Sequence, residues 1–130
     1  MGETARRILL VDDEPTVVKM VKKRLEVSGF EVVVAVDGEE ALAKAAGARF
    51  DAVVLDLMLP KMNGMDVCAT LKQNQSYNDI PIVVIFSGKG QPEDEEQCRR
   101  LGAAAYVSKS QGAVHVIEQI NALLGPGNGT

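Results

Sequence analysis

The stretch VVLDLMLPKMNG, residues 53–64, sets the fold that we expect for the whole chain. It begins as an apolar run that stops at Asp56, and Pro60 followed by an Asn-Gly pair then favours a turn. An apolar run without alternation is typical of a parallel strand that is covered on both faces. We therefore expect a buried strand over Ala52–Leu55, with an aspartate at its carboxyl end.

Short apolar runs and helical patterns alternate in both directions from this stretch. The other expected strands are Ile8–Val11, Val32–Ala35, Ile82–Phe86 and Ala104–Val107. The expected helices are approximately Pro15–Ser28, Glu39–Ala46, Met65–Gln73, Pro92–Leu101 and Ala113–Leu124. This order predicts an α/β fold of the (βα)5 doubly wound type, with a five-stranded parallel sheet between two layers of helices. A common strand order for such units is 2-1-3-4-5.

Apolar stripes on the first and last helices indicate which side of each helix faces the sheet. In the first helix we expect one face to carry Val17, Met20, Val21 and Leu25. In the last helix we expect the inward residues to be Val114, Ile117, Ile120 and Leu124.

The composition fits one globular domain. The chain has 130 residues, of which 46% are hydrophobic, and its net charge of −4 disfavours contact with nucleic-acid phosphates. No apolar run reaches the roughly 18 residues of a membrane span. No signal-type apolar region follows the N-terminus, so we expect a cytoplasmic protein without membrane insertion. We assign residues 1–124 to the domain and residues 125–130 to a flexible tail or the start of a linker.

Four of the five expected strands run into residues that can support chemistry. In chain order these residues are Asp12, Asp13 and Glu14, then Asp56, Ser87 and Lys109. Each of them alone is ordinary, because acids cap helices and lysines face water. In open α/β sheets, however, ligands bind beyond the carboxyl ends of the strands. Since all of these residues are expected at that edge, their joint placement indicates a site.

The charges expected at this edge do not balance. Two unit charges about 4 Å apart repel by about 4 kcal/mol at an effective dielectric of 20. If Asp12, Asp13 and Asp56 converge, one lysine does not neutralise them, so either a carboxylate keeps a proton or a cation binds. Oxygen ligands with room for water suit Mg²⁺. A carboxylate beside such an ion can attack phosphorus, with the metal, Lys109 and Ser87 stabilising the transferring phosphoryl group.

Four strings in the sequence resemble the motifs of response-regulator receiver domains in two-component signalling, the CheY-like superfamily. They are LVDDE at 10–14, VVLDLMLPKMNG at 53–64, FSG at 86–88 and YVSK at 106–109. The resemblance spans about residues 6–124 and implies the flavodoxin-like, CheY-like fold. It also implies that one aspartate accepts a phosphoryl group from a histidine kinase, a histidine phosphotransfer protein or a small phosphodonor. Such a domain catalyses its own phosphorylation and dephosphorylation but turns over no separate substrate, so it is not expected to be an enzyme in the usual sense.

The resemblance implies a role for each motif residue. Asp56 would be the phosphoacceptor, and Lys109 would pair with the phosphoryl group. Asp13, Asp56 and the backbone carbonyl of Met58 would ligate Mg²⁺ or another divalent cation such as Mn²⁺. Asp12 would act mainly through a metal-bound water.

Two further residues match the family's switch positions. Ser87 takes the place of the switch hydroxyl and Tyr106 that of the switch aromatic. Phosphorylation would then alter the surface formed by Pro92–Arg100, Tyr106 and the helix over Ala113–Leu124, which would bind a downstream protein target. Alternatively, Tyr106 is a half-buried strand residue whose hydroxyl faces water.

The pair Lys109-Ser110 departs from the family pattern, in which a proline follows the lysine after a cis peptide bond. A cis bond before another residue type costs about 3–4 kcal/mol. The sequence therefore leaves open both the isomer of this peptide bond and the reach of Lys109.

Three alternative functions are weighed against a phosphorylated receiver. A phosphate-independent interaction module would share the fold, but such modules usually lack an acid or the lysine. A phosphohydrolase of the haloacid dehalogenase type needs a second acid where this chain has Met58. A flavodoxin-like cofactor binder needs a phosphate-binding loop after the first strand, where three acids stand.

Overall fold

The computed structural model describes residues 6–73, 82–88 and 92–124. Its strands are β1 (Arg7–Val11), β2 (Glu31–Ala35), β3 (Ala52–Leu55), β4 (Ile82–Ser87) and β5 (Ala105–Ser108). Its helices are α1 (Pro15–Val27), α2 (Gly38–Gly47), α3 (Gly64–Gln73), α4 (Pro92–Arg100) and α5 (Ala113–Leu124), with a short 3₁₀ turn over Lys109–Gln111 before α5. The predicted order of elements is confirmed, and their bounds agree to within one residue. The expected tail, 125–130, lies outside the described residues.

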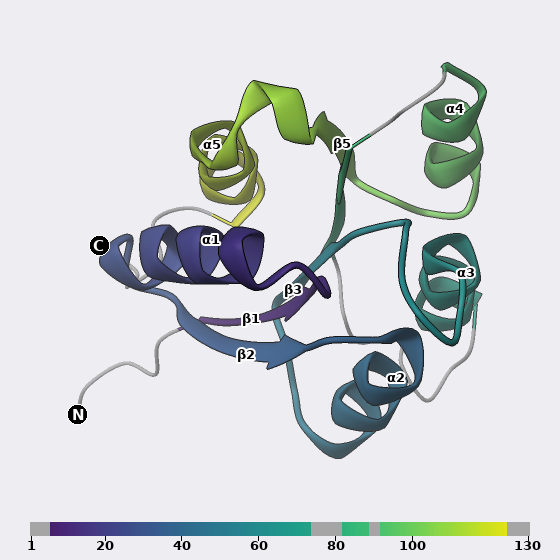
Figure 1. Ribbon diagram of the computed structural model, residues 1–130, viewed down its shortest axis with the longest axis horizontal. Coiled ribbons are helices and arrows are strands. Elements are labelled where there is room, and N and C mark those ends of the chain that lie inside the picture. Colours follow the sequence, from purple (N-terminus) through teal and green to yellow (C-terminus); the bar gives the residue numbers. More distant parts are fainter. Residues whose placement is uncertain (1–5, 74–81, 89–91, 125–130) are drawn as a thin grey trace.

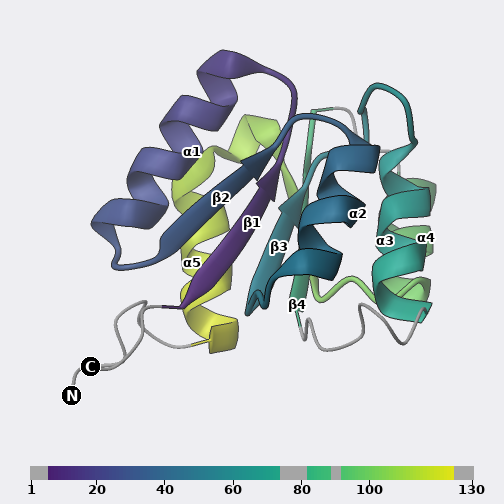
Figure 2. The same cartoon turned by 90° about the horizontal axis from the view of Figure 1, so that it is seen from below.

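The five strands form one parallel sheet in the order β2-β1-β3-β4-β5, as predicted. Helices α1 and α5 cover one face of this sheet, and α2, α3 and α4 cover the other (Figures 1 and 2). None of the helices in the described part of the chain is long and apolar enough to cross a membrane.

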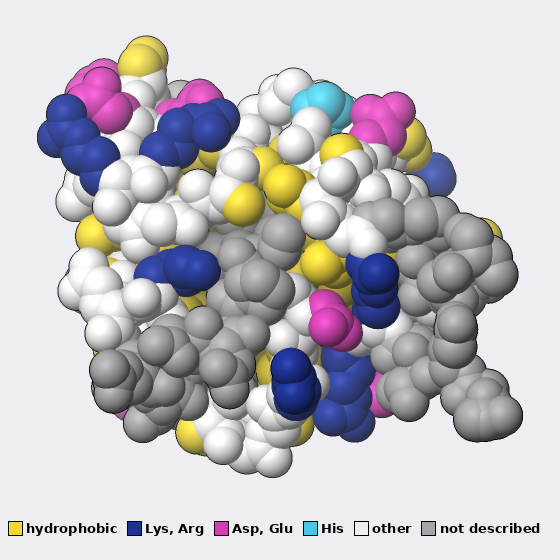
Figure 3. Space-filling view, turned by 180° about the vertical axis from the view of Figure 1, so that it is seen from behind, with side chains coloured by type: hydrophobic (Ala, Val, Ile, Leu, Met, Phe, Trp, Pro, Cys, Tyr) yellow, Lys and Arg dark blue, Asp and Glu magenta, His cyan; other side chains and the backbone are white. Residues whose placement is uncertain are grey.

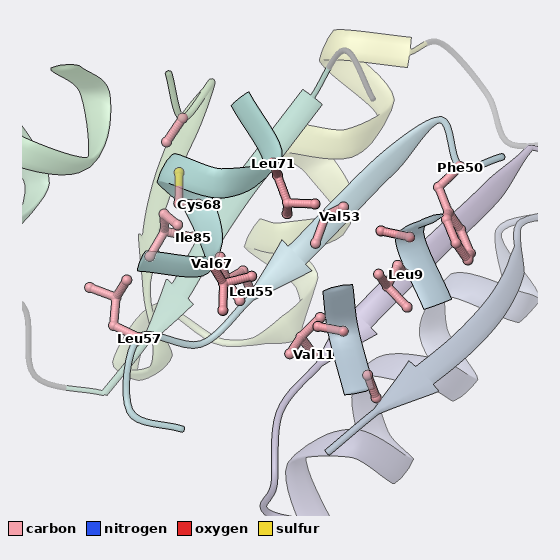
Figure 4. Packing of buried hydrophobic residues seen from close by; sticks show 14 of the residues in the cluster. Leu9, Val11, Phe50, Val53, Leu55, Leu57, Val67, Cys68, Leu71 and Ile85 are labelled. Carbon is pink, nitrogen blue, oxygen red and sulfur yellow. The ribbon is translucent and has the colours of Figure 1, made fainter. Parts of the chain in front are cut away.

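Strand β3 is apolar throughout because its residues alternate between two hydrophobic cores. Val53 and Leu55 pack towards α2 and α3, where Val67, Cys68 and Leu71 are also buried (Figure 4). Ala52 and Val54 point to the opposite face and join the cluster formed with α1 and α5. All four residues of β3 are buried, which explains the uninterrupted apolar run in the sequence.

Two residues expected on inward helix faces lie instead at the surface. Met20 of α1 is 44% exposed and Val114 of α5 is 49% exposed, so both predictions are wrong. In α5 the buried stripe is centred on Ala113, Ile117 and Ile120, with Val116 also buried. Successive helix residues are turned by about 100°, so Val114 sits one such step from the middle of the stripe.

The carboxyl ends of β4 and β5 each extend one residue beyond the prediction. They include Ser87 and Ser108, which are register partners in the parallel ladder. Regular strand pairing therefore continues up to the edge of the sheet where the expected site lies.

Candidate functional site

Strand pairing fixes the backbone of two aspartates at the centre of the sheet edge. Val11 and Leu55 are register partners in β1 and β3, and each is followed directly by an aspartate. The Asp56 N–H donates to the Val11 carbonyl at 3.0 Å, and the Asp12 N–H donates to the Ala35 carbonyl at 3.1 Å. Both carboxylates are buried as a result.

The carboxylates of Asp12, Asp13 and Asp56 converge. Each offers an oxygen that lies within 4.8 Å of the corresponding oxygens of the other two. Asp13 is exposed, whereas Asp12 and Asp56 are buried. The structure thus brings together the three acids that the sequence indicated.

The ammonium of Lys109, which directly follows the edge strand β5, reaches this acidic cluster. Its Nζ lies 2.9 Å from Asp56 Oδ2 and 3.0 Å from Asp12 Oδ2. A third carboxylate, that of Glu14, is nearer still, at 2.7 Å. An ammonium has three hydrogens to donate, so these carboxylates match its full capacity.

The other oxygen of Asp56 is held by two donors. The Ser87 hydroxyl lies 3.2 Å from Asp56 Oδ1 and donates to it, and the Met58 N–H donates to the same atom at 3.1 Å. Ser87 is also buried. The carboxylate of Asp56 is therefore fixed at both oxygens, with a hydroxyl and an amide on one and a cation on the other.

Burial and ion pairing shift two pKa values at the site. Burial raises the pKa of Asp12 above its usual 3.8, although the Glu14 backbone N–H and Lys109 partly offset this. Burial alone lowers the pKa of Lys109, but its hydrogen bonds with Glu14, Asp56 and Asp12 outweigh burial and raise it. Lys109 is therefore a cation throughout the neutral range.

The loop after β3 lies close against the site because Gly64 has no side chain. A Cβ at Gly64 would collide with the Asp56 carbonyl oxygen and lie 2.5 Å from Leu57 Cα. Lys61 in this loop adopts a positive φ of 68°. Asp13, Met58 and neighbouring loop residues line a pocket of about 500 Å³ beside the acids. The side chain of Met58 is 73% exposed there.

The peptide bond between Lys109 and Ser110 is trans, because no cis bond occurs among the described residues. The 3₁₀ turn that starts at Lys109 is stabilised by Ser108. The Ser108 hydroxyl accepts from the Ser110 N–H at 3.3 Å, and the Ser108 N–H donates to Gln111 Oε1 at 2.9 Å. Proline has no N–H to donate at position 110. A turn built on this donor therefore still delivers Lys109 to Asp56.

Tyr106 is partly buried and packs against the core cluster that contains residues of α3 and α4. Its hydroxyl oxygen is buried and has no hydrogen-bond partner within the part of the chain that is described. The alternative in which this hydroxyl faces water therefore does not hold. The pKa of Tyr106 is raised, mainly by burial and next by the nearby Cys98.

The two cysteines are free and buried. Burial raises the pKa of Cys68 to about 11 and also raises that of Cys98. Thiols with raised pKa values react slowly, because the thiolate is the reactive form. Both thiols therefore fit a structural role in the core.

Sequence reasoning assigned no role to Glu14, although its carboxylate is the nearest of the three that pair with Lys109 Nζ. The available signal was its place as the third consecutive acid after a strand. Because acids at that position also begin helices, the sequence alone did not distinguish a cap from a lysine partner.

The acidic cluster suits a divalent cation. It offers carboxylate oxygens, the donors that Mg²⁺ and Mn²⁺ prefer. Lys109 is the only cation with a salt bridge to Asp12 or Asp56 among the described residues, so negative charge is left in excess.

Comparison with known proteins gives consistent matches. The model of the family described as response regulator receiver domain matches residues 8–121. The alkaline phosphatase synthesis transcriptional regulatory protein PhoP of Bacillus subtilis is 39% identical over 119 residues, which are 92% of this chain and 48% of that protein. The chain thus spans about half the length of this relative.

Two solved structures have the same fold. A CheY-like receiver domain protein from Methanospirillum hungatei superposes with a TM-score of 0.85 at 27% identity, covering 93% of this chain and 94% of its own. The Mn²⁺-bound form of the response regulator Rcp1 superposes with a TM-score of 0.80 at 28% identity, and the match covers 90% of this chain and 92% of that one.

Proposed function

The chain belongs to the response regulator receiver domain family, and from this premise we propose that it signals by accepting a phosphoryl group on Asp56. Receiver domains of this family act with kinases and downstream effectors, and they are generally not enzymes that turn over a separate substrate. We propose that this domain acts in the cytoplasm.

One observation carries the proposal. Asp56 is buried at the sheet edge, with Ser87 and the Met58 N–H on one carboxylate oxygen and Lys109 on the other. A carboxylate that only stabilised the fold would need a counter-ion, but it would not need two further acids beside it. The convergence of Asp12 and Asp13 on the same point favours a site for a cation and a phosphoryl group.

The chemical step is an in-line transfer. A carboxylate oxygen of Asp56 attacks phosphorus, a new O–P bond forms, and the bond from phosphorus to the donor breaks. The donor's atom leaves with the electron pair: a histidine nitrogen, or the acetate oxygen when acetyl phosphate is the donor. Lys109 offsets the charge on the moving phosphoryl oxygens, and Ser87 donates a hydrogen bond to one of them.

We propose Mg²⁺, or Mn²⁺ in its place, as the cofactor. Asp13, Asp56 and the backbone carbonyl of Met58 would hold the ion, with Asp12 as a more distant carboxylate. Bound there, the ion supplies positive charge to the phosphoryl oxygens and reduces the repulsion among the acids. Support comes from the converging carboxylates and from the likeness of this fold to the Mn²⁺-bound form of Rcp1.

We propose a protein, not DNA, as the direct output partner. The net charge of −4 disfavours contact with DNA phosphates. The surface formed by α4, β5 and α5 is our candidate, because Tyr106 of β5 packs beside α4. Acidic and basic side chains gather over α4 at one corner of the molecule (Figure 3), with acids in its first turn and Arg99 and Arg100 in its last.

The phosphoryl donor would be a histidine kinase or a histidine phosphotransfer protein. After transfer, Ser87 would follow the phosphoryl oxygens and Tyr106 would respond through the β4–β5 pair. This is a population shift driven by contacts that only the phosphorylated state can make.

Intact mass measured after incubation with acetyl phosphate tests the proposal. We expect a gain of one phosphoryl group that requires Mg²⁺ and disappears in Asp56→Asn. The matched control is Asp51→Asn, because Asp51 precedes β3 at the opposite end and accepts from the Arg7 N–H. No gain in the wild-type chain under any condition would favour the phosphate-independent interaction module.

A further inference from the structure

Glu14 makes a contact that neither the fold nor the proposed chemistry requires. Its Oε1 lies 2.7 Å from Lys109 Nζ, across a sequence separation of 95 residues. It also occupies the N-cap position of α1, yet its side chain makes no capping hydrogen bond. The carboxylate therefore contacts the lysine and does not cap the helix that it precedes.

The three carboxylates around Lys109 differ in how easily each could be released. The side chains of Asp12 and Asp56 are 2% and 3% exposed, whereas that of Glu14 is 58% exposed. A buried carboxylate that loses its cation remains desolvated and uncompensated. An exposed one is readily hydrated by water, and ion pairs at the surface are weak.

A phosphoryl group on Asp56 would require a donor from the same ammonium. All three of the hydrogens on Lys109 Nζ are matched by carboxylates before transfer. While the phosphoryl group approaches and Asp56 is still an anionic carboxylate, one of these partners must therefore give way to a phosphoryl oxygen. The burial pattern makes Glu14 the partner that costs least to lose.

We propose that Glu14 is a displaceable partner of Lys109 that competes with the incoming phosphoryl group and so slows phosphorylation of Asp56. Glu14 is a positioning residue, since it acts through the lysine. Asp12 and Asp56 keep the ammonium in place when Glu14 is absent, so its removal frees a donor without losing the lysine's position. This inference rests on the proposed function of Asp56.

Two properties of the Glu14 side chain, its charge and its length, can be separated by substitution. Glu14→Asp keeps the charge but shortens the side chain by one methylene, which withdraws the carboxylate from Lys109. Glu14→Gln keeps the reach and an acceptor oxygen but removes the charge. Glu14→Ala removes both. Glu26→Gln is the control, because Glu26 lies at the other end of α1 and pairs with Lys22.

The experiment follows the rate of phosphoryl gain by intact mass, with acetyl phosphate and Mg²⁺, for each of these proteins. We expect Glu14→Ala and Glu14→Asp to react about two- to fivefold faster than the wild-type chain, the factor that corresponds to losing an exposed ion pair. Glu14→Gln should fall between them and the wild type, and Glu26→Gln should match the wild type. Repeating the series at high salt separates contact from long-range charge, which salt screens.

Each outcome has a defined meaning. Acceleration in the aspartate variant that persists at high salt supports competition by contact. An aspartate variant as slow as the wild type, with only the neutral variants faster, overturns it in favour of simple repulsion of an anionic donor. Equal rates in all proteins overturn the role of Glu14 but leave Asp56 as the acceptor. No phosphoryl gain in any protein overturns the proposed function itself, and the role of Glu14 with it.

Discussion

Ser87 Oγ lies 3.2 Å from Asp56 Oδ1, and both side chains are buried. The two residues come from neighbouring strands of the sheet, β4 and the end of β3. The hydroxyl therefore contacts the proposed acceptor before any phosphoryl group is present. The same hydrogen bond that stabilises the resting carboxylate is available to be transferred to a phosphoryl oxygen.

Ser87→Ala is expected to lower the free energy of unfolding by about 1 kcal/mol, the usual value for one buried hydrogen bond. The variant should still gain a phosphoryl group, but the tyrosine signals that report on Tyr106 should respond less to it. Urea unfolding and NMR of the two forms measure these effects. Ser87→Thr keeps the hydroxyl and is the matched control. Full stability together with a full tyrosine response in the alanine variant would contradict the prediction.

Asp12→Asn is expected to stabilise the metal-free protein at pH 7. Burial raises the pKa of Asp12 above 3.8, so the folded state favours the protonated carboxyl. Below pH 3.8 the protonated Asp12 carboxyl makes its full contribution to the stability of the folded state. This contribution is lost as the pH rises through the pKa of Asp12 in the folded state, so at neutral pH the ionised carboxylate destabilises the fold. The advantage of asparagine should therefore shrink as the pH falls towards 3.8. Urea unfolding along a pH series checks both points.

Adding Mg²⁺ should make the wild-type chain more stable than Asp12→Asn, the reverse of the order expected without the metal. The ion should stabilise the wild-type chain more than Asp12→Asn, because the variant has lost one negative charge near the acidic cluster. Asp51→Asn, at the other end of β3, should respond to Mg²⁺ like the wild type. Thermal unfolding with EDTA and with excess Mg²⁺ distinguishes the three proteins. An equal shift in all of them would place the ion elsewhere.

Tyr106→Phe is expected to raise the free energy of unfolding by up to about 1 kcal/mol. The hydroxyl oxygen is buried without a hydrogen-bond partner in the described part of the chain, and removing an unpaired buried polar group relieves its desolvation cost. Urea unfolding of the two proteins, both unphosphorylated, gives the difference. A loss of stability of similar size would mean that the hydroxyl has a partner.

Gly64→Ala is expected to destabilise the protein by about 1–3 kcal/mol, as overpacking does. Its methyl group would meet the backbone of Asp56 and Leu57, which strand β3 holds in place. Gly47→Ala is the control, since a Cβ at Gly47 meets nothing within 4 Å. Only the first variant should also slow phosphoryl gain, because only it displaces the proposed acceptor. Equal stability of the two variants would show that the loop relaxes.

The fold was predictable from the sequence because the central strands β1 and β3 are almost wholly buried and each is followed directly by an aspartate. In β3 the apolar run stops at Asp56. This one residue therefore marked the end of the strand and the position of the candidate site. The orientation of the helices was harder to predict. Met20 and Val114 are apolar but lie outside the buried stripes, and a hydrophobic residue on the surface is common enough to mislead a pattern.

The candidate site could be predicted as a set of residues but not as a set of contacts. Parallel strand order brings Asp12, Asp56 and Ser87 to one edge whatever their side chains do. The partner that a long side chain reaches depends on the local backbone conformation, which the sequence did not determine. For Lys109, the sequence left open whether the following peptide bond is cis or trans, and it is trans. For the same reason, the contact between Lys109 and Glu14 was not visible in the sequence.

The cation at the centre of this cluster enters the chain late. Lys109 follows Asp56 by 53 residues and belongs to the segment just after the last strand of the sheet. During synthesis, the first three strands can therefore pair before the lysine exists, which leaves Asp12 and Asp56 facing each other without it. Their repulsion opposes closure of that edge until β5 arrives or a divalent ion takes its place. Pairing of the final strand, β5, therefore also brings Lys109 to the two aspartates, so completing the sheet completes the site.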